Sequence, residues 1–375
     1  MELSVIREQL DQIDRQLMEL FEQRMELCQE VAQFKIETGK PVFDKERERQ
    51  KIESVRGMVE GEFQKQAAEE LFTQLMTISR RSQYRILEQN GVPVELGFKP
   101  VDTLHKTGVK VVYQGVEGAY SHAAALQYFG EDVDAYHVRT WEDAMKAVED
   151  KEADYAVIPI ENSSAGAVSD NYDQLLKHNN VIVAETMVTV NHALLGLPGT
   201  DISDIQAVYS HPQALMQCSE FLNSHDAWRQ ISVENTAVAA RKIIEDGDKT
   251  QAAVASETAG RLYGLSVLEP SINHNKNNTT RFLILARDHI YRRDAGKISI
   301  CFELPHKSGS LYNMLGNFIY NGVNMVMIES RPILGRNWEY RFFVDIEGSL
   351  SDPAVRNALN GVSAEASGMW ILGNY

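Results

Sequence analysis

The chain has 375 residues, and at roughly 100 to 200 residues per domain this length predicts two or three domains. Its 37 Lys and Arg against 53 Asp and Glu give a net charge of −16, which disfavours a nucleic-acid partner because phosphate contacts need clustered cations. No apolar run approaches the roughly 18 to 20 residues that span a membrane, and the N-terminus lacks the pattern of a secretory signal. We therefore expect a cytoplasmic protein with no membrane partner. Three widely spaced cysteines predict neither disulfides nor a zinc site, and we expect no metal and no cofactor.

The first 90 residues predict three helices. Between residue 5 and about residue 37, apolar side chains recur at intervals of four and three with no Gly or Pro, which indicates one helix of about 33 residues. Arg24 interrupts that apolar row, and a charge there needs either a salt bridge or an anionic ligand; this position alone leaves both open. A second helix is predicted from Asp44, a suitable N-cap, to about residue 59, and a third over residues 64–89. Ser79 and Gln83 share one face of the third helix.

The rotation of the first helix relates three cations. Lys35 follows Arg24 by 11 residues, which is three turns plus about 20° at 100° per residue, so both face the same side. Arg7 precedes Arg24 by 17 residues and is rotated by about 260°, so it points elsewhere. If Arg7 serves the same pocket, a partner chain must supply it, which predicts an intertwined dimer.

A linker is predicted at residues 91–107, and strands then alternate with helices over residues 108–287. This alternation predicts an α/β domain with parallel strands and with ligand sites at the strand exits. The strand candidates are residues 109–113, 156–160, 181–184, 207–209, 252–255 and 282–286, and helices are predicted at about 123–126, 214–222 and 237–244.

The last region, residues 296–375, predicts a small separate module. Its elements follow the order strand 297–304, helix 309–321, strand 324–331, strand 339–347, helix 352–366 and strand 369–373. This βαββαβ order is that of a ferredoxin-like α+β fold with its helices on one face of an antiparallel sheet. The module has no constellation of acid, base and nucleophile, so a regulatory role is at least as plausible as a catalytic one.

Motifs in all three regions resemble known families. Residues 1–90 resemble the all-helical chorismate mutases, because eight residues fall on that family's active-site pattern. Residues 108–287 resemble the prephenate dehydratases in four ordered segments, 115–121, 159–163, 210–214 with Gln217, and 278–282. Residues 296–375 resemble an ACT domain of the dehydratase type. Together the regions match, nearly end to end, the bifunctional enzymes of bacterial phenylalanine synthesis. The mutase pattern consists of Arg7, Arg24, Lys35, Asp44, Arg47, Glu48, Ser79 and Gln83, and the ACT motifs are Gly309, Ser310, Leu311 and Glu329, Ser330, Arg331, Pro332.

The resemblance assigns roles within the mutase region. Arg24 and the other protomer's Arg7 would bind the carboxylates of chorismate, while Lys35 and Gln83 would donate to its ether oxygen. The remaining residues would address the ring hydroxyl or complete the polar shell. Cations and amides suffice for this chemistry, because the rearrangement to prephenate is pericyclic and needs only a held conformer and stabilised charge. A helical hairpin used only for dimerisation would leave Arg24 unexplained. Of these remaining residues, Asp44 and Glu48 would contact the ring hydroxyl of chorismate, and Arg47 and Ser79 would complete the polar shell.

For residues 108–287 the resemblance implies a two-lobed fold like that of periplasmic binding proteins and a decarboxylating dehydration of prephenate to phenylpyruvate. Thr280 is the family's essential residue. Chemistry alone favours Glu161 as proton donor, because burial can raise the pKa of a carboxyl group, so we hypothesise that both residues hydrogen-bond the leaving hydroxyl. Arg281 is a candidate to pair with a substrate carboxylate. The other residues implied to line the site are Asn162, Ser210 and Gln217.

The ACT resemblance implies that phenylalanine binds as a feedback inhibitor at a subunit interface of a homodimer or a higher oligomer. Ser310 departs from the Ala that the family usually has there. Two other functions stay open at this point: a dehydratase that prefers arogenate, the aminated analogue of prephenate, and a metabolite sensor without turnover.

Overall fold

A computed structural model describes residues 2–92 and 96–375, and the chain divides into two compact units. One unit contains the N-terminal region up to Leu96 together with Ile300–Trp370, and the other contains Gly97–Ser299 together with Ile371–Tyr375. The N-terminal helices and the C-terminal module, which the sequence suggests are separate domains, therefore share a unit. Within the described residues, no helix is both long enough and apolar enough to cross a membrane.

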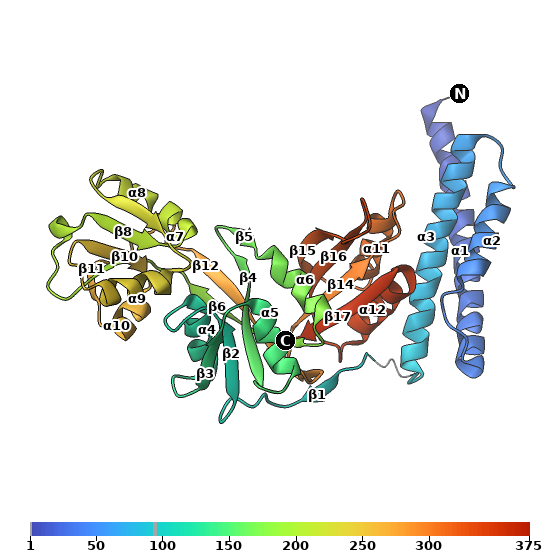
Figure 1. The fold of residues 1–375 in the computed structure, drawn as a ribbon. Coiled ribbons are helices and arrows are strands. Elements are labelled where there is room, and N and C mark those ends of the chain that lie inside the picture. The colour runs from blue at the N-terminus through green and yellow to red at the C-terminus, as the bar shows by residue number, and fades with distance from the viewer. Residues whose placement is uncertain (1, 93–95) are drawn as a thin grey trace. The chain divides into compact units, whose positions relative to one another are not determined.

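Three helices form the N-terminal part of the first unit, as predicted (Figure 1). They are α1 (Leu3–Thr38), α2 (Lys45–Arg56) and α3 (Glu62–Gln89), and α3 packs against both α1 and α2. Helix α1 ends at Gly39, whose φ of 67° lies in the left-handed region that favours glycine. Asp44 caps α2 as expected, since its side chain accepts a hydrogen bond from the backbone N–H of Arg47.

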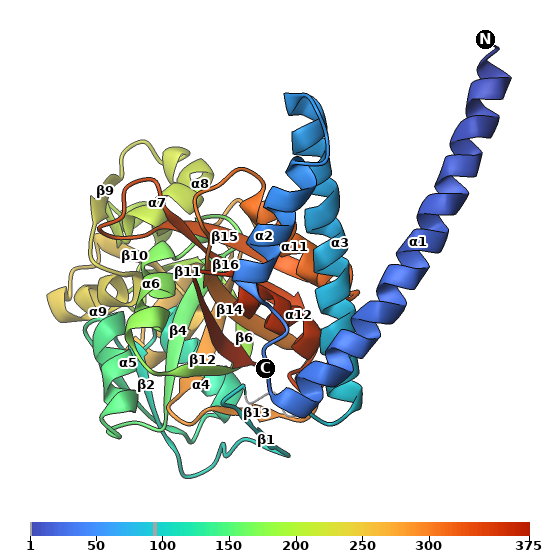
Figure 2. The same ribbon diagram turned by 90° about the vertical axis from the view of Figure 1, so that its right-hand side faces the viewer.

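Most of α1 is exposed along its apolar row. Within Leu3–Thr38, all of which the structure describes, only Ala32 is buried. Leu10, Leu17 and Leu20 are 53%, 55% and 60% exposed. Figure 2 shows α1 leaving the neighbourhood of α2 and α3 as it runs toward the N-terminus. The apolar side chains that the sequence arranges in one row thus face outward in a single chain.

The C-terminal module has the predicted βαββαβ order. Its sheet has the order β15-β16-β14-β17, and helices α11 and α12 pack together over buried aromatic residues that include Phe302 and Phe318. Helix α12 also packs against α3, where Arg356 on α12 forms an ion pair of 2.5 Å with Glu88 on α3. The elements are β14 (Lys297–Glu303), α11 (Ser310–Ile319), β15 (Met325–Pro332), β16 (Tyr340–Glu347), α12 (Pro353–Glu365) and β17 (Gly368–Asn374).

The second unit has two lobes, each built on its own sheet. The first sheet has the order β6-β12-β4-β2-β3 with β5 beside β4, and the second has the order β11-β7-β10-β8-β9. The first lobe contains β2 (Lys110–Gln114), α4 (Tyr120–Phe129), β3 (Asp134–Val138), α5 (Trp141–Glu149), β4 (Tyr155–Asn162), β5 (Gly166–Ala167), α6 (Ser169–Lys177), β6 (Val181–Thr189) and β12 (Thr279–Ala286). The second contains β7 (Ala193–Gly196), the 3₁₀ turn η1 (Ile202–Asp204), β8 (Ala207–Ser210), α7 (Pro212–Gln217), α8 (Ser219–Asn223), β9 (Arg229–Ser232), α9 (Thr236–Asp246), β10 (Gln251–Ala255), α10 (Glu257–Tyr263) and β11 (Ser266–Glu269).

The prediction of parallel strands is wrong in part. Strand β2 is parallel to β3 and β4, and β8 is parallel to β9 and β10. Strand β12, however, lies antiparallel between β4 and β6, and β7 is antiparallel to β10. The chain leaves the first lobe after β6 and returns as β12 in the opposite direction, which the local alternation of strands and helices does not reveal.

Part of the predicted linker forms a strand. Residues 93–95 of the predicted segment 91–107 lie outside the described residues. Within that segment, β1 (Lys99–Val101) pairs in parallel with β13 (Ile290–Arg292), just after the first lobe's last strand. The predicted helix 214–222 is likewise two short helices that meet at Cys218.

Candidate active sites

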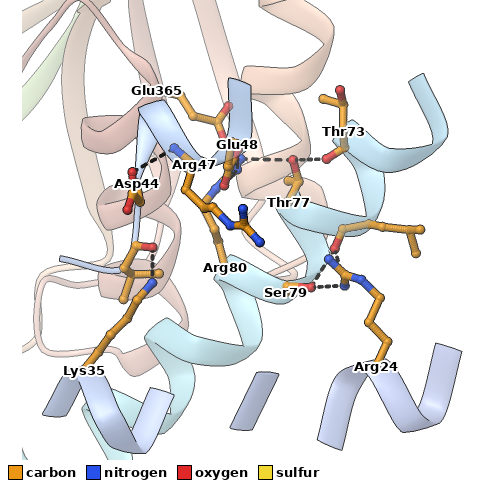
Figure 3. Close-up of polar contacts among 12 residues, drawn as sticks. Arg24, Lys35, Asp44, Arg47, Glu48, Thr73, Thr77, Ser79, Arg80 and Glu365 are labelled. Atoms are coloured by element: carbon orange, nitrogen blue, oxygen red, sulfur yellow. Dashed lines mark hydrogen bonds and ion pairs between the residues drawn. The ribbon is translucent and has the colours of Figure 1, made fainter. Parts of the chain in front are cut away.

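Packing of α3 on α1 brings four of the predicted mutase residues together. Figure 3 shows three of them, Arg24, Lys35 and Ser79. The Arg24 guanidinium donates to the backbone oxygen of Leu75 at 3.2 Å and to the hydroxyl of Ser79. The Lys35 ammonium donates to Gln83 Oε1 at 3.1 Å and to the backbone oxygen of Val42 at 2.6 Å. Each cation is therefore matched with a polar side chain of α3. The α3 partners, Ser79 and Gln83, lie about one helical turn apart, and the α1 cations, Arg24 and Lys35, lie about three turns apart on one side of their helix.

Helix α2 contributes the second wall of this cluster. Both carboxylate oxygens of Glu48 accept hydrogen bonds from Arg80 of α3, while the Asp44 carboxylate caps the helix and the side chain of Arg47 is exposed. Burial lowers the pKa of Lys35 below its ordinary value, although the nearby carboxylates of Asp44 and Glu48 oppose the shift. The cluster thus holds cations and anions in alternation, which suits a polar, charged ligand.

Arg7 is not part of the cluster. It lies 17 residues before Arg24, or roughly 25 Å along the helix axis, and its side chain is exposed. This position agrees with the rotation argument, which does not allow Arg7 to reach the pocket of its own chain.

A cavity of about 270 Å³ lies between the two lobes of the second unit. The first sheet contributes Asn162 and Thr280, the second lobe contributes Gln217, and the N-terminal ends of α4 and α9 open onto the same space. The described residues that line it are Gln114, Gly115, Ala119, Tyr120, Ser121, Trp141, Pro159, Asn162, Val168, Val190, His192, His211, Gln213, Ala214, Gln217, Asn235, Thr236, Thr280 and Phe282.

A network of amides holds the Thr280 hydroxyl. The Asn162 side-chain nitrogen donates to Thr280 Oγ1 at 2.9 Å and to Asn278 Oδ1 at 2.8 Å. Its oxygen accepts from the backbone N–H groups of Ser164 and Ala165, at 3.0 and 2.9 Å, which determines the orientation of the amide. Because the Thr280 oxygen accepts from Asn162, its own proton is the one that a ligand in the cavity can receive.

A second set of hydrogen-bonded polar side chains lines the cavity. The Tyr120 hydroxyl lies 3.1 Å from His192 Nδ1, and His192 Nε2 lies 3.1 Å from Gln217 Oε1. Burial lowers the pKa of His192 to about 4, so the imidazole is neutral at pH 7. His192 therefore acts as a hydrogen-bonding group and not as a cation.

Comparison with known proteins identifies both regions. Residues 6–84 match the family model of chorismate mutase type II, and residues 111–290 match that of prephenate dehydratase. The bifunctional chorismate mutase/prephenate dehydratase of Escherichia coli (strain K12) is 33% identical over 380 residues, which cover 100% of this chain and 96% of that protein. The chain belongs to the bifunctional chorismate mutase/prephenate dehydratase family. It is an enzyme of phenylalanine biosynthesis with a chorismate mutase domain and a prephenate dehydratase domain.

Two further relatives match the dehydratase part. The arogenate dehydratase/prephenate dehydratase 1, chloroplastic, of Arabidopsis thaliana is 40% identical over 283 residues, covering 71% of this chain and 72% of that protein. The crystal structure of a prephenate dehydratase from Arthrobacter aurescens in complex with L-Phe has 30% identity and a TM-score of 0.66, covering 71% of this chain and 90% of that one.

Two residues predicted for the dehydratase site lie on the wrong side of their strands. Glu161 precedes Asn162 on β4 and Arg281 follows Thr280 on β12, and successive side chains of a strand point to opposite faces. Glu161 and Arg281 are cross-strand partners with an Nη1–Oε2 distance of 3.9 Å, and neither is among the described residues that line the cavity. In this arrangement Glu161 faces Arg281 and not the cavity, so its contact with the leaving hydroxyl stays a prediction.

Arg281 instead belongs to a buried cluster behind the cavity. Its Nε donates to Glu185 Oε2 at 2.6 Å and its Nη2 to the hydroxyl of Tyr375 at 2.7 Å, and Lys297 pairs with the same Glu185 carboxylate. A guanidinium held by these groups stabilises the strand that carries Thr280, and its contact with a substrate carboxylate stays a prediction.

Ser210 also has a different place from the one expected. It is fully buried, and its hydroxyl donates to the backbone oxygen of Val254 at 2.6 Å, which joins β8 to β10. It supports the strand end beside His211, whereas Gln217, the other predicted residue of this motif, does line the cavity.

Sequence reasoning missed several residues at both sites. At the dehydratase site, His192 follows the exit of β6, a position where α/β folds place ligand residues, and this was the available signal. At the mutase site, Arg80 follows Ser79 and contacts both Glu48 and Glu365. Glu365 lies 285 residues away from Arg80, and no local pattern indicates the contact.

Proposed function

We propose that the α1–α3 cluster is the mutase site, and the Lys35–Gln83 hydrogen bond is the observation that carries the proposal. Because Gln83 Oε1 accepts from Lys35, the amide nitrogen of Gln83 and a remaining proton of Lys35 are both available as donors. Two donors that converge on the ether oxygen of chorismate stabilise the negative charge that develops there as the bond breaks. No proton transfer or covalent intermediate is needed.

The other residues of the pattern hold the substrate in its compact conformer. Arg24, steadied by Ser79, binds a carboxylate, and the exposed Arg47 completes the cationic wall. Asp44 and Glu48 accept from the ring hydroxyl. Holding the reacting atoms in this arrangement supplies the entropic part of the rate enhancement.

We further propose that the mutase domain is an intertwined homodimer. The exposed apolar row on α1 is a surface that a soluble helix of this length buries against another helix, and a second copy of α1 offers the same row. The partner chain then supplies Arg7 as the second carboxylate ligand. Association of these dimers into a higher oligomer is compatible with this arrangement.

For the dehydratase site, we propose that Thr280 donates a hydrogen bond to the departing ring hydroxyl of prephenate. Loss of carbon dioxide supplies the electron pair that aromatises the ring while the C–O bond to the hydroxyl breaks, and the departing oxygen takes up a proton from solvent to become water. Asn162 directs the Thr280 proton into the cavity, and Gln217 and neutral His192 contact the bound acid. The N-terminal ends of α4 and α9 carry partial positive charge and can bind its carboxylates, which explains how a cavity without a lining Lys or Arg among the described residues holds a dianion.

Prephenate is the preferred substrate in this proposal. Arogenate carries an ammonium group where prephenate has a keto oxygen, and the described lining of the cavity contains no Asp or Glu to pair with it. The test is a product assay with the full-length chain and, separately, chorismate, prephenate and arogenate. We expect phenylpyruvate from the first two substrates, and little phenylalanine from arogenate. Efficient turnover of arogenate would favour the alternative dehydratase, and turnover of none would favour a sensor.

We propose that the C-terminal module is an ACT domain that binds phenylalanine and inhibits the dehydratase. A hollow of about 130 Å³ is lined by Leu304, Ser310, Leu311, Tyr340 and Phe342, which offers apolar and polar contacts for an amino acid. Gly309, with a φ of 79°, precedes α11, whose N-terminus has no side-chain cap, and Glu329, Ser330, Arg331 and Pro332 form the end of β15.

Calorimetry with phenylalanine, followed by a dehydratase assay at saturating phenylalanine, tests this regulatory role. We expect binding together with loss of dehydratase turnover. Absence of binding, or binding that leaves turnover unchanged, would contradict it. A cytoplasmic location stays a prediction from the sequence.

A further inference from the structure

Arg80 is a buried cation at the edge of the mutase site. Only 7% of its surface is exposed, and it follows Ser79 on α3 (Figure 3). Its Nη1 donates to both carboxylate oxygens of Glu48, at 2.6 and 2.5 Å. Its Nη2 donates to Glu365 Oε1 at 2.6 Å and to Thr77 Oγ1 at 3.0 Å, and the guanidinium lies 5.0 Å from the centre of the Phe43 ring.

The two carboxylates that hold Arg80 come from distant parts of the sequence. Glu48 belongs to α2 of the mutase domain, and Glu365 is the last residue of α12 in the C-terminal module. Burial disfavours the charge on Arg80, but the charges and hydrogen bonds of both carboxylates outweigh it, so the pKa of Arg80 lies above its ordinary value. A buried guanidinium with one of its two counter-charges removed turns more strongly to the other.

We propose that Arg80 and Glu365 are positioning residues of the mutase reaction, and that the C-terminal module completes the mutase site through them. This rests on the proposed role of Glu48 at the ring hydroxyl of chorismate. Glu365 accepts from Nη2 of Arg80, so only Nη1 holds Glu48. The lone pairs of the Glu48 carboxylate that point away from Arg80 are then left for the substrate.

Without the Glu365 charge, the whole fork of Arg80 can close on Glu48 in the two-nitrogen geometry that guanidinium and carboxylate prefer. Glu48 is then drawn away from the ring hydroxyl, and binding and orientation of chorismate suffer. The dehydratase residues lie in the other compact unit and are not expected to change.

The same pair of helices offers a matched control. Arg356 of α12 donates to Glu88 of α3 at 2.9 and 2.5 Å, and the Glu88 side chain is 19% exposed against 16% for Glu365. Glu88 therefore resembles Glu365 in burial, charge and helix pair, but its partner Arg356 is not a residue of the mutase cluster. A variant at Glu88 measures the effect of weaker packing between α3 and α12 alone.

The experiment compares Glu365→Gln, Glu88→Gln, Glu48→Gln and the two double variants that contain Glu48→Gln, all in the full-length chain. Mutase kcat and KM, dehydratase turnover and the thermal unfolding midpoint are measured for each. We expect Glu365→Gln to lower mutase kcat/KM about tenfold with unchanged dehydratase turnover, and Glu88→Gln to stay within about twofold of wild type. In the Glu48→Gln background, Glu365→Gln should have no further effect.

Three results would overturn the inference: a Glu365→Gln mutase within about twofold of wild type, an equal loss in Glu88→Gln, or the same loss from Glu365→Gln with and without Glu48. A Glu48→Gln enzyme with wild-type mutase turnover would instead refute the proposed site itself. If Glu365→Gln folds poorly, Glu365→Asp tests the same contact, because it keeps the charge but withdraws the carboxylate from Arg80. It should show a loss in the same direction, and wild-type kinetics in that variant would refute the inference.

Discussion

Asn162→Asp isolates the step in which Asn162 aims the Thr280 proton. The aspartate keeps an oxygen that can accept from the backbone N–H groups of Ser164 and Ala165, so the local turn is preserved. It loses the N–H group that donates to Thr280 Oγ1 at 2.9 Å. The new carboxylate accepts from the Thr280 hydroxyl instead, which turns its proton away from the cavity.

The size of the effect separates two interpretations of this contact. Loss of a donor aimed at developing charge costs roughly 100-fold to 1,000-fold in kcat. Loss of an ordinary structural hydrogen bond costs about 1 kcal/mol, or roughly fivefold. We expect the larger loss, because the substitution removes the donation from Thr280 to the leaving hydroxyl and also places a negative charge beside a dianionic substrate.

The assay follows formation of phenylpyruvate from prephenate at pH 7. The mutase activity of the same chain reports whether the rest of the protein is intact and should not change. Asn275→Asp is the matched control, since Asn275 is an exposed residue on a neighbouring loop and is not among the described residues that line the cavity. An Asn162→Asp enzyme within about fivefold of the wild-type kcat would refute the role given to Thr280.

Three further predictions follow from named contacts. Arg7→Ala and Lys35→Ala chains should each lack mutase activity, but an equal mixture refolded together should regain about a quarter of the wild-type activity. Half of the dimers then contain both variants, and in each of these one of the two sites is intact. No regain would place Arg7 outside the partner's site. Tyr375→Phe removes an acceptor from buried Arg281, so urea unfolding of the second unit should show a loss of roughly 1.5 to 3 kcal/mol with mutase turnover unchanged, and an unaltered midpoint would show that the contact contributes little. His192, whose pKa is lowered from 6.5 to about 4, stays neutral in the folded chain while the unfolded chain takes up a proton, so wild-type stability should fall by about 2 kcal/mol between pH 7 and pH 5 relative to His192→Gln. Parallel pH profiles of the two proteins would contradict the buried, neutral imidazole.

Helical periodicity predicted the relative placement of the cations on α1 well because one helix fixes the relation between its own residues. The 100° rotation per residue places Arg24 and Lys35 on one side and Arg7 on another, and α1 has that arrangement in the structure. The polar partners Ser79 and Gln83 share a face of α3 for the same reason. Distances along a single regular element follow from sequence positions alone.

The side chains of strands were harder to place, because a sequence motif taken as a whole does not say which face of the strand each of its residues occupies. Glu161 and Asn162 are neighbours in one motif, yet only Asn162 points into the cavity, and the same holds for Arg281 and Thr280. On β12 the two-residue period separates Arg281 from Thr280 and Phe282. On β4 a bulge shifts the register, so Pro159 and Asn162 both line the cavity and the simple period does not apply. The antiparallel direction of β12 and the contact of Arg80 with Glu365 depend on how distant segments return to each other, and no local pattern encodes that return.

One chain performs two successive reactions, and the first supplies the substrate of the second. Product analysis of the full-length Thr280→Ala chain supplied with chorismate tests it most directly. We predict that prephenate accumulates at the wild-type rate of chorismate consumption and that phenylpyruvate does not form. Formation of phenylpyruvate at the wild-type rate would contradict the role of Thr280, and loss of chorismate consumption together with the dehydratase activity would contradict two separate sites.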